Sequence, residues 1–176
     1  MRSRIITAVA VIGLAGFALA GCGQEQASNQ PAETPAAGGA PAATAADMSP
    51  EGNQKYLEDN KAKAGVTTTA SGLQYRVIKA GAGASPTAND VVNVTYKGWL
   101  IDGTVFDETP PGQTATFPAG ALIPGWVEAL QLMKEGDEWE IVLPSDLGYG
   151  AQGAGGVIPP NQTLVFNMAL LGVQKQ

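Results

Sequence analysis

Alternating apolar and polar residues dominate the C-terminal two thirds of the chain. Apolar side chains occupy every second position in 73–77, 92–96 and 139–143, with mostly polar residues between them. This pattern predicts strands with one buried face. Asp102-Gly103 lies between two apolar runs, which is typical of a tight hairpin turn. Residues 164–171 are almost all apolar, which predicts a central strand.

One segment of this region has helical periodicity instead. Trp126, Leu130 and Met133 are spaced i, i+4 and i+7, so they share one face of a short helix over 125–133. Several strands and one short helix indicate an α+β domain over 66–176, a curved antiparallel sheet wrapped around the helix. Such packing leaves a cavity between the concave face of the sheet and the helix.

The first 21 residues have the pattern of a lipoprotein signal peptide. Arg2 and Arg4 precede an apolar run over 5–20, which is shorter than the roughly 20 residues of a spanning helix. The run ends in Leu19-Ala20-Gly21-Cys22, which resembles the bacterial signal whose cysteine is lipidated and becomes the first mature residue. Cys22 is the only cysteine of the chain. We therefore expect a lipid anchor at Cys22; an uncleaved anchor with a buried cysteine is the alternative.

Two further segments separate this signal from the domain. Residues 22–48 are rich in Ala, Pro and Gly and have no aromatic or branched aliphatic side chain. Such a segment cannot bury enough apolar area to offset the entropy lost on ordering, so we expect a disordered tether. Ser49-Pro50 is typical of a helix start and Gly65 of a helix end, so 49–65 is predicted to be a short, mostly solvated helix. Gly23, in place of an Asp after the cysteine, resembles the outer-membrane sorting signal of enteric-type Gram-negative bacteria. It predicts a location on the periplasmic face of that membrane.

Composition excludes several kinds of site. The 176 residues include no His and one Cys, so Ser-His-Asp triads, Cys-His dyads and His-ligated zinc are ruled out. The net charge of −6 makes the chain a poor candidate for nucleic-acid binding. The glycines of 148–153 match a dinucleotide-binding pattern, but Pro159-Pro160 follows where that fold needs a helix. We therefore expect no metal, no cofactor and no nucleic-acid partner.

Candidate function rests on aromatic residues that are spread over five predicted elements. Tyr96, Phe106, Trp126, Tyr149 and Phe166 are either ordinary core residues or the walls of a pocket. Ile123-Pro124-Gly125 favours the pocket, because this rigid turn sets the helix start beside an apolar wall. Asp107 also favours it, because a carboxylate at the edge of an apolar pocket is costly unless something uses it.

Six short motifs follow one another along 94–166. They are Val94-Thr95-Tyr96-Lys97-Gly98, Asp102-Gly103-Thr104-Val105-Phe106-Asp107, Ile123-Pro124-Gly125-Trp126, Gly148-Tyr149-Gly150, Ile158-Pro159-Pro160-Asn161 and Leu164-Val165-Phe166. In this order and spacing they resemble the FKBP-type peptidyl-prolyl cis-trans isomerases, and the resemblance covers 71–173. Residues 67–75 and 131–136 are more similar to the bacterial infectivity-potentiator subgroup of exported isomerases. That subgroup often has a long helical dimerisation arm, to which only 49–65 could correspond here.

The resemblance implies an isomerase of X-Pro bonds and assigns its site. The implied site has Trp126 as the floor, Tyr96, Phe106 and Phe166 as walls, Leu122 and Ile123 as one lip, Val157 and Ile158 on the loop side, Asp107 at the rim and Tyr149 as a hydroxyl donor. The Ile123 N–H is expected to bind a ligand carbonyl. The implied partners are unfolded or proline-containing exported proteins and macrolide inhibitors, with the membrane reached through Cys22.

The sequence departs from the family's usual pattern at three places. Ala115 stands where eukaryotic members usually have an aromatic residue, and Ala154 where some have a histidine. The segment 108–112 is shorter and stiffer and lacks an arginine often found there. These departures bear on substrate preference and macrolide affinity. They leave two alternatives to an isomerase: a holdase chaperone that grips proline-containing segments with little turnover, and a structural lipoprotein with a degenerate pocket.

Overall fold

The computed structural model describes residues 46–176. The predicted signal peptide, the lipidation site Cys22 and most of the predicted tether lie outside the described residues. The regular elements are, in chain order, α1 (Pro50–Lys61), β1 (Val66–Thr68), β2 (Gln74–Lys79), β3 (Val91–Leu100), β4 (Val105–Glu108), β5 (Ala115–Pro118), α2 (Pro124–Leu132), β6 (Glu138–Leu143) and β7 (Leu164–Gln174), with three single-turn 3₁₀ helices at 119–121, 145–147 and 150–152. Within 46–176, no helix is both long and apolar enough to span a membrane.

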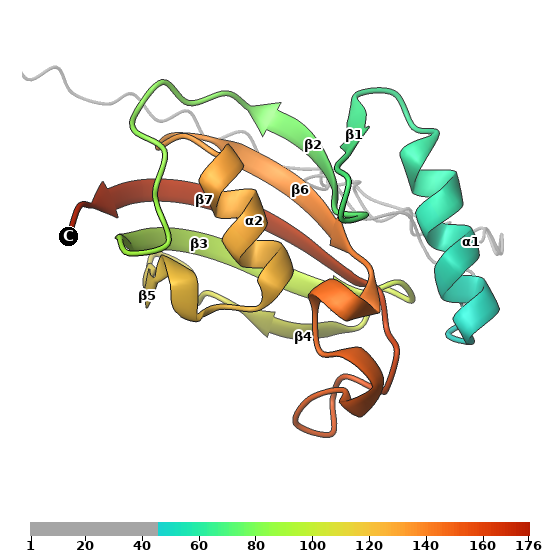
Figure 1. The fold of residues 1–176 in the computed structure, drawn as a ribbon. Helices are drawn as coiled ribbons and strands as arrows, with labels where there is room; N and C mark the ends of the chain where they lie inside the picture. The colour runs from blue at the N-terminus through green and yellow to red at the C-terminus, as the bar shows by residue number, and fades with distance from the viewer. Residues whose placement is uncertain (1–45) are drawn as a thin grey trace, which may run out of the picture. The chain divides into compact units, whose positions relative to one another are not determined.

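All seven strands belong to one antiparallel sheet (Figure 1). The strand order is β1-β2-β6-β7-β3-β4, and β5 pairs with the first half of β3 on the same edge as β4. The apolar strand β7 lies between β3 and β6: it pairs along its whole length with β3, and residues 164–169 pair with β6. This arrangement confirms the predicted α+β class and the predicted central strand.

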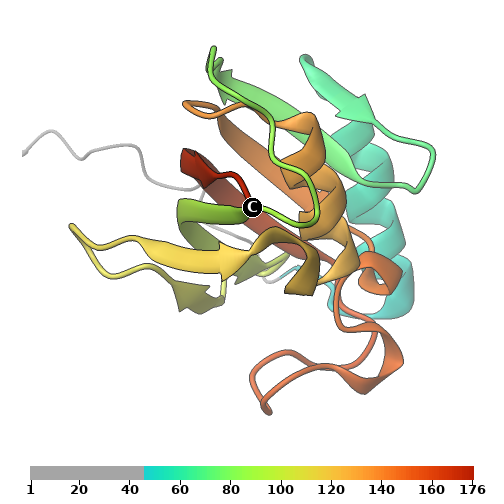
Figure 2. The same ribbon diagram turned by 60° about the vertical axis from the view of Figure 1, so that its left-hand side comes forward.

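Helix α2 packs on one face of the sheet, which curves around it (Figure 2). The face predicted from sequence is the buried one: Trp126 is 3 % exposed, and Leu130 and Met133 are fully buried. Burial of a leucine such as Leu130 stabilises the fold by about 1.5–3 kcal/mol. The helix approaches β6 closely at Gly125, where an added Cβ would lie 2.6 Å from Cδ2 of Leu143. A larger residue at 125 would therefore push the helix away from the sheet.

Two strands were not predicted, and both are short and poor in apolar residues. The polar run 67–71 indicates only a lead-in to the domain, but Val66–Thr68 pairs with 74–76 of β2. Ala115–Pro118 pairs with 91–94 of β3 and has one large apolar side chain, Phe117. Neither segment is long enough for its own pattern to identify a half-buried strand, although burial alternates along Ala115–Pro118. Each is held by pairing with a longer neighbour.

Helix α1 begins as predicted and ends earlier than predicted. The Ser49 hydroxyl accepts a hydrogen bond from the Gly52 N–H at 3.1 Å, and Pro50 occupies the first helical position. The helix ends at Lys61 instead of continuing to Gly65. Gly65 has a φ of +79° and lies in the turn before β1, so it is a turn residue and not the helix cap.

The helix attaches to the domain through polar side chains. Its two buried residues are Asn53 and Asn60, which are 4 % and 2 % exposed. By contrast, the apolar residues Tyr56 and Leu57 are only partly buried, and Ala64, beyond the end of the helix, is exposed. Buried amides need hydrogen-bond partners, so the contact depends on a specific polar network more than on apolar area.

Asp90 holds the end of β7 against the loop before β3. Its carboxylate accepts hydrogen bonds from the Thr87 N–H at 2.6 Å and from Lys175 Nζ at 2.9 Å. The Gln176 N–H donates to it as well, at 3.2 Å. The residue is 2 % exposed. The ion pair with Lys175, followed by the Thr87 bonds, holds the pKa of Asp90 well below its usual value of 3.8.

We expect this carboxylate to make the fold sensitive to acid. Below about pH 4 the unfolded chain takes up a proton at Asp90 while the folded chain does not, so the free energy of unfolding falls as the pH is lowered further. Asp90→Asn and Lys175→Met should each make the urea midpoint depend less steeply on pH between 4 and 2. Unfolding curves across this range test the prediction, and wild-type slopes in both variants would contradict it.

Candidate active site

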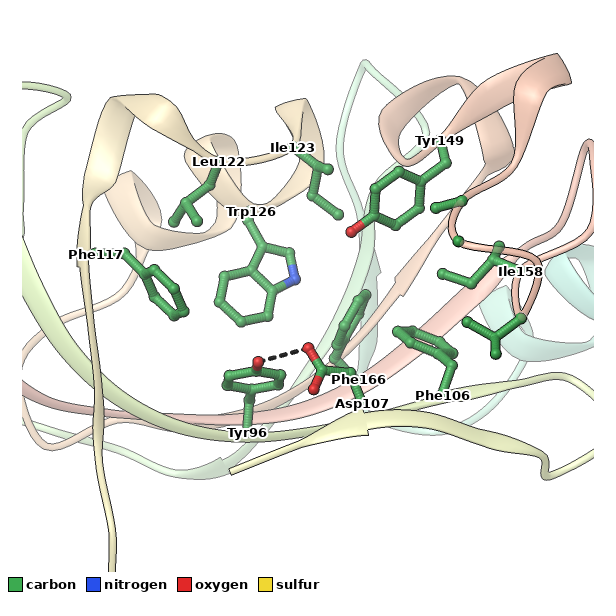
Figure 3. A pocket seen from close by; sticks show the side chains of 13 residues that line it. Tyr96, Phe106, Asp107, Phe117, Leu122, Ile123, Trp126, Tyr149, Ile158 and Phe166 are labelled. Carbon is green, nitrogen blue, oxygen red and sulfur yellow. Dashed lines mark hydrogen bonds between the residues drawn. The ribbon is translucent and has the colours of Figure 1, made fainter. Parts of the chain in front are cut away.

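A pocket with a volume of about 340 Å³ opens between the concave face of the sheet and the N-terminal end of α2 (Figure 3). This is at the small end of the roughly 300–1,000 Å³ found for ligand pockets. It is lined by Tyr96 of β3, Phe106 and Asp107 of β4, Phe117 of β5, Leu122 and Ile123 before α2, Trp126 of α2, Tyr149, Ala154, Gly155, Val157 and Ile158 of the loop before β7, and Phe166 of β7.

Trp126 forms the floor of the pocket inside a frame of aromatic rings. The rings of Tyr96 and Phe166 lie 5.0 and 5.2 Å from it, at 83° and 81°. Phe117 lies 6.3 Å from Trp126, also nearly perpendicular, and Phe106 lies 5.4 Å from Phe166. Edge-to-face packing of this kind is favourable for aromatic pairs. Because its neighbours meet Trp126 at right angles, the indole is held in one orientation.

Two polar groups of adjacent strands are joined at the pocket wall. The Tyr96 hydroxyl donates a hydrogen bond of 2.7 Å to Oδ2 of Asp107, drawn as the dashed line in Figure 3. Burial, followed by the bond to Asp107, raises the pKa of Tyr96 well above its usual value of 10.0. The hydroxyl therefore stays protonated near neutral pH. It fixes the carboxylate, which is itself exposed to solvent, at the rim.

Three further hydrogen-bond donors lie at the pocket. Nε1 of Trp126 is buried and has no acceptor in the described part of the chain. Ile123 precedes the first turn of α2, where backbone N–H groups have no partner within the helix. The Tyr149 side chain is 41 % exposed and directs its hydroxyl into the cavity (Figure 3). These donors can meet the carbonyl oxygens of a bound peptide.

The structure brings together all ten pocket residues proposed from the sequence. Trp126 is at the floor, Tyr96, Phe106 and Phe166 are at the sides, and the remaining six surround the opening: Asp107, Leu122, Ile123, Tyr149, Val157 and Ile158. Sequence reasoning missed Phe117 and Gly155, and treated Ala154 only as a departure from the family. Phe117 gave a weak signal, as a lone large aromatic residue in a segment of only four residues.

The lining supports binding and orientation without covalent chemistry. It holds one carboxylate, the two tyrosine hydroxyls and the indole N–H, and no thiol, amine or serine hydroxyl. The rest of its surface is apolar and aromatic. Such a site suits a small apolar ring flanked by carbonyl groups, which is the description of a proline inside a peptide.

Comparison with known proteins agrees with this description. Residues 83–171 match the family model described as FKBP-type peptidyl-prolyl cis-trans isomerase. The chain belongs to the FKBP family. Residues 18–77 match a second model, the domain amino terminal to FKBP-type peptidyl-prolyl isomerase. The predicted resemblance to the FKBP family is therefore confirmed, and the second match extends it to residues before the predicted range 71–173.

Individual FKBP relatives extend the comparison. The chain is 54% identical over 127 residues to the peptidyl-prolyl cis-trans isomerase Mip of Coxiella burnetii, covering 72% of this chain and 55% of that protein. It is 52% identical over 121 residues to the outer membrane protein MIP of Legionella longbeachae, covering 68% and 52%. A crystal structure of a peptidyl-prolyl cis-trans isomerase from Pseudomonas syringae is matched over 79% of this chain and 100% of that one, with a TM-score of 0.68 and 37% identity. The chain thus spans about half the length of the curated FKBP relatives it matches.

Proposed function

We propose that the chain is a peptidyl-prolyl cis-trans isomerase that acts on exported, proline-containing proteins. The observation that carries this proposal is the aromatic frame around Trp126, which forms a small apolar pocket with hydrogen-bond donors at its edge. Membership of the FKBP family supports it, as do relatives named for this activity.

The reaction needs no bond to be made or broken. The barrier to rotation about a peptide bond is about 18–20 kcal/mol and comes from amide resonance, which places negative charge on the carbonyl oxygen. The twisted form has less of that charge, so a dry aromatic pocket favours it over the planar form. A rate gain of 10⁴–10⁶ requires the barrier to fall by only about 5–8 kcal/mol.

Each part of the pocket has a role in this mechanism. Trp126 would support the proline ring, while Tyr96, Phe106 and Phe166 exclude water from it. The Ile123 N–H and the Tyr149 hydroxyl would hold the carbonyls on either side, so that rotation is confined to the bond between them. Leu122, Val157 and Ile158 would contact the flanking residues, and Asp107 would lie near the rotating carbonyl.

The proposal includes a place in the cell. Cleavage before Cys22 and lipidation of that residue would anchor the protein, with 23–48 as a tether and the isomerase domain at 66–176. A relative named as an outer membrane protein supports the outer membrane as the location, and we place the anchor on its periplasmic face. The substrates would then be unfolded proteins that have just crossed the inner membrane, and macrolides that enter FKBP pockets would be inhibitors.

The decisive experiment is the rate of cis-trans exchange in a short Leu-Pro peptide, measured with the purified protein with and without an FKBP-directed macrolide. We expect macrolide-sensitive acceleration, because substrate and inhibitor would compete for the floor at Trp126. A folded protein that leaves the rate unchanged would contradict the proposal.

A holdase is the second candidate, and the exposed apolar rim favours it. Tyr149 and Val157, at the opening of the pocket, are 41 % and 57 % exposed. They could grip an extended apolar segment whether or not its proline rotates. If a variant without isomerase activity still suppresses the aggregation of an unfolded client protein, the holdase role belongs to the rim.

A further inference from the structure

The N-terminal half of α1 is bonded to the base of the loop that closes the pocket. This loop, residues 149–162 and hereafter the pocket loop, contributes five lining residues: Tyr149, Ala154, Gly155, Val157 and Ile158. Its last residues run past α1 before entering β7, and the two segments lie side by side in both views (Figures 1 and 2).

Asn53 of α1 makes this connection. Its Nδ2 group donates to Oε1 of Gln162 at 3.1 Å, and its Oδ1 accepts from the Thr163 N–H at 2.7 Å. The same Nδ2 group also contacts the carbonyls of Met48 and Ser49, at 3.1 and 3.0 Å. One side chain therefore joins the start of α1 to the start of β7.

Gln162 carries the connection into the pocket loop. Its Nε2 group donates to the carbonyl of Pro160 and to that of Met48, both at 3.1 Å. Gln162 and Thr163 are 7 % and 1 % exposed, so water cannot readily replace these partners. Pro160 lies two residues from Ile158, which is 6 % exposed and faces the pocket.

The returning segment of the pocket loop, 158–162, is also held by hydrogen bonds within the loop itself. The Asn161 N–H donates to the carbonyl of Gly150 at 2.8 Å, and Ala154 and Ile158 exchange two backbone hydrogen bonds of 2.9 and 3.0 Å. The returning segment 158–162 is therefore fixed from inside by the loop and from outside by α1. Loss of the outer support would leave the position of Ile158 less defined.

We propose that Asn53 and Gln162 are positioning residues, through which the docking of α1 sets the shape of the pocket loop and hence the affinity for substrate. Helix α1 follows the predicted tether. The buried hydrogen bonds of Asn53 and Gln162 therefore connect the segment by which the chain enters the domain to the loop that forms one wall of the pocket. The kinetic consequence rests on the proposed isomerase function, whereas the structural coupling does not.

The second buried asparagine of α1 provides a matched control. Nδ2 of Asn60 donates to Oε1 of Gln74 at 2.8 Å, and Nε2 of Gln74 donates to the carbonyl of Leu57 at 2.9 Å. This pair docks the other end of the same helix on β2, with no bond to the pocket loop. Asn60→Ala should therefore loosen the helix without removing the direct support of the loop.

Hydrogen exchange of the full chain tests the coupling. We expect Asn53→Ala and Gln162→Ala to speed amide exchange in 150–160 about tenfold, the effect of losing one buried hydrogen bond. Exchange at the amides of β7, in the centre of the sheet, shows whether a variant has lost stability throughout the domain. Asn60→Ala should change the loop less than either variant, even where it lowers the urea midpoint as much. Wild-type protection of the loop in both coupling variants, or an equal effect of Asn60→Ala, would overturn the proposal.

Steady-state kinetics on the same Leu-Pro peptide provide the second readout. Asn53→Ala and Gln162→Ala should raise KM about threefold to tenfold with a smaller change in kcat, because a displaced loop weakens binding before it affects rotation. An unchanged KM in both would refute the kinetic consequence. If the wild-type protein has no isomerase activity, the proposed function fails, and hydrogen exchange still decides the coupling.

Discussion

Replacing Asp107 by valine is expected to lower kcat/KM by about 10- to 100-fold, the range that corresponds to one lost hydrogen bond to a charged group. The carboxylate fixes the Tyr96 hydroxyl, and its charge opposes the negative charge that resonance places on the carbonyl oxygen of a planar peptide bond. Valine provides neither effect. Because Asp107 is exposed, the free energy of unfolding should change by less than about 1 kcal/mol.

Tyr96→Phe separates the two contributions of Asp107. This variant removes the same hydrogen bond of 2.7 Å but leaves the carboxylate in place. A smaller loss of kcat/KM than in Asp107→Val would show that the charge itself contributes to turnover. Full activity in Asp107→Val, measured by peptide exchange on folded protein, would remove this residue from the proposed site.

Gly98→Ala is expected to disturb the pocket by displacing two of the aromatic rings that line it. A Cβ at this position would lie 2.7 Å from Cζ of Phe106 and 2.7 Å from Cε1 of Phe166, closer than any carbon contact allows. The two rings would have to move into the cavity. We expect a loss of stability of about 1–3 kcal/mol, as for other overpacked cores. We also expect at least about a tenfold loss of kcat/KM, because both rings belong to the proposed site.

Gly172→Ala is the matched control in the same sheet. Gly172 pairs with Asn93 across β7 and β3, and an added Cβ would come no closer than 3.4 Å to a neighbour, the side chain of Asn93. Stability should stay within about 0.5 kcal/mol of the wild type. In the double variant Gly98→Ala/Phe106→Leu, the smaller side chain should restore part of the stability. If the double variant is no more stable than Gly98→Ala, the loss of stability comes from the backbone and not from the rings.

The sheet and α2 could be predicted from sequence because their residues repeat with a clear period. Strand β6 alternates, residues 164–171 of β7 are almost all apolar, and Trp126, Leu130 and Met133 share a helical face. Strands β1 and β5 could not be predicted, because each is short and forms by pairing with a longer strand: β1 with the adjacent β2, and β5 with the more distant β3. Their own side chains carry little of the energy that holds them.

The candidate site shows the same division. Most of the pocket residues follow from the motifs that resemble the FKBP family, since those motifs have fixed spacing. The packing role of Gly98 does not, because it depends on two rings that reach it from β4 and β7. Asn53 and Gln162 were also missed: polar residues on a short helix and in a loop are usually solvated. Their burial arises only when segments 109 residues apart in sequence meet.

The central position of β7 determines when the domain can fold. This strand lies between β3 and β6, and it is the last strand of the sheet in sequence. A chain that emerges from a ribosome or a membrane pore N-terminus first exposes β3, and later β6, before 164–174 is available to pair with them. The sheet must therefore close late, through contacts between distant residues, which slows folding. Until that step the strands can form only two separate sheets, β1-β2-β6 and β3 with β4 and β5, whose unpaired edges on β6 and β3 are prone to aggregation.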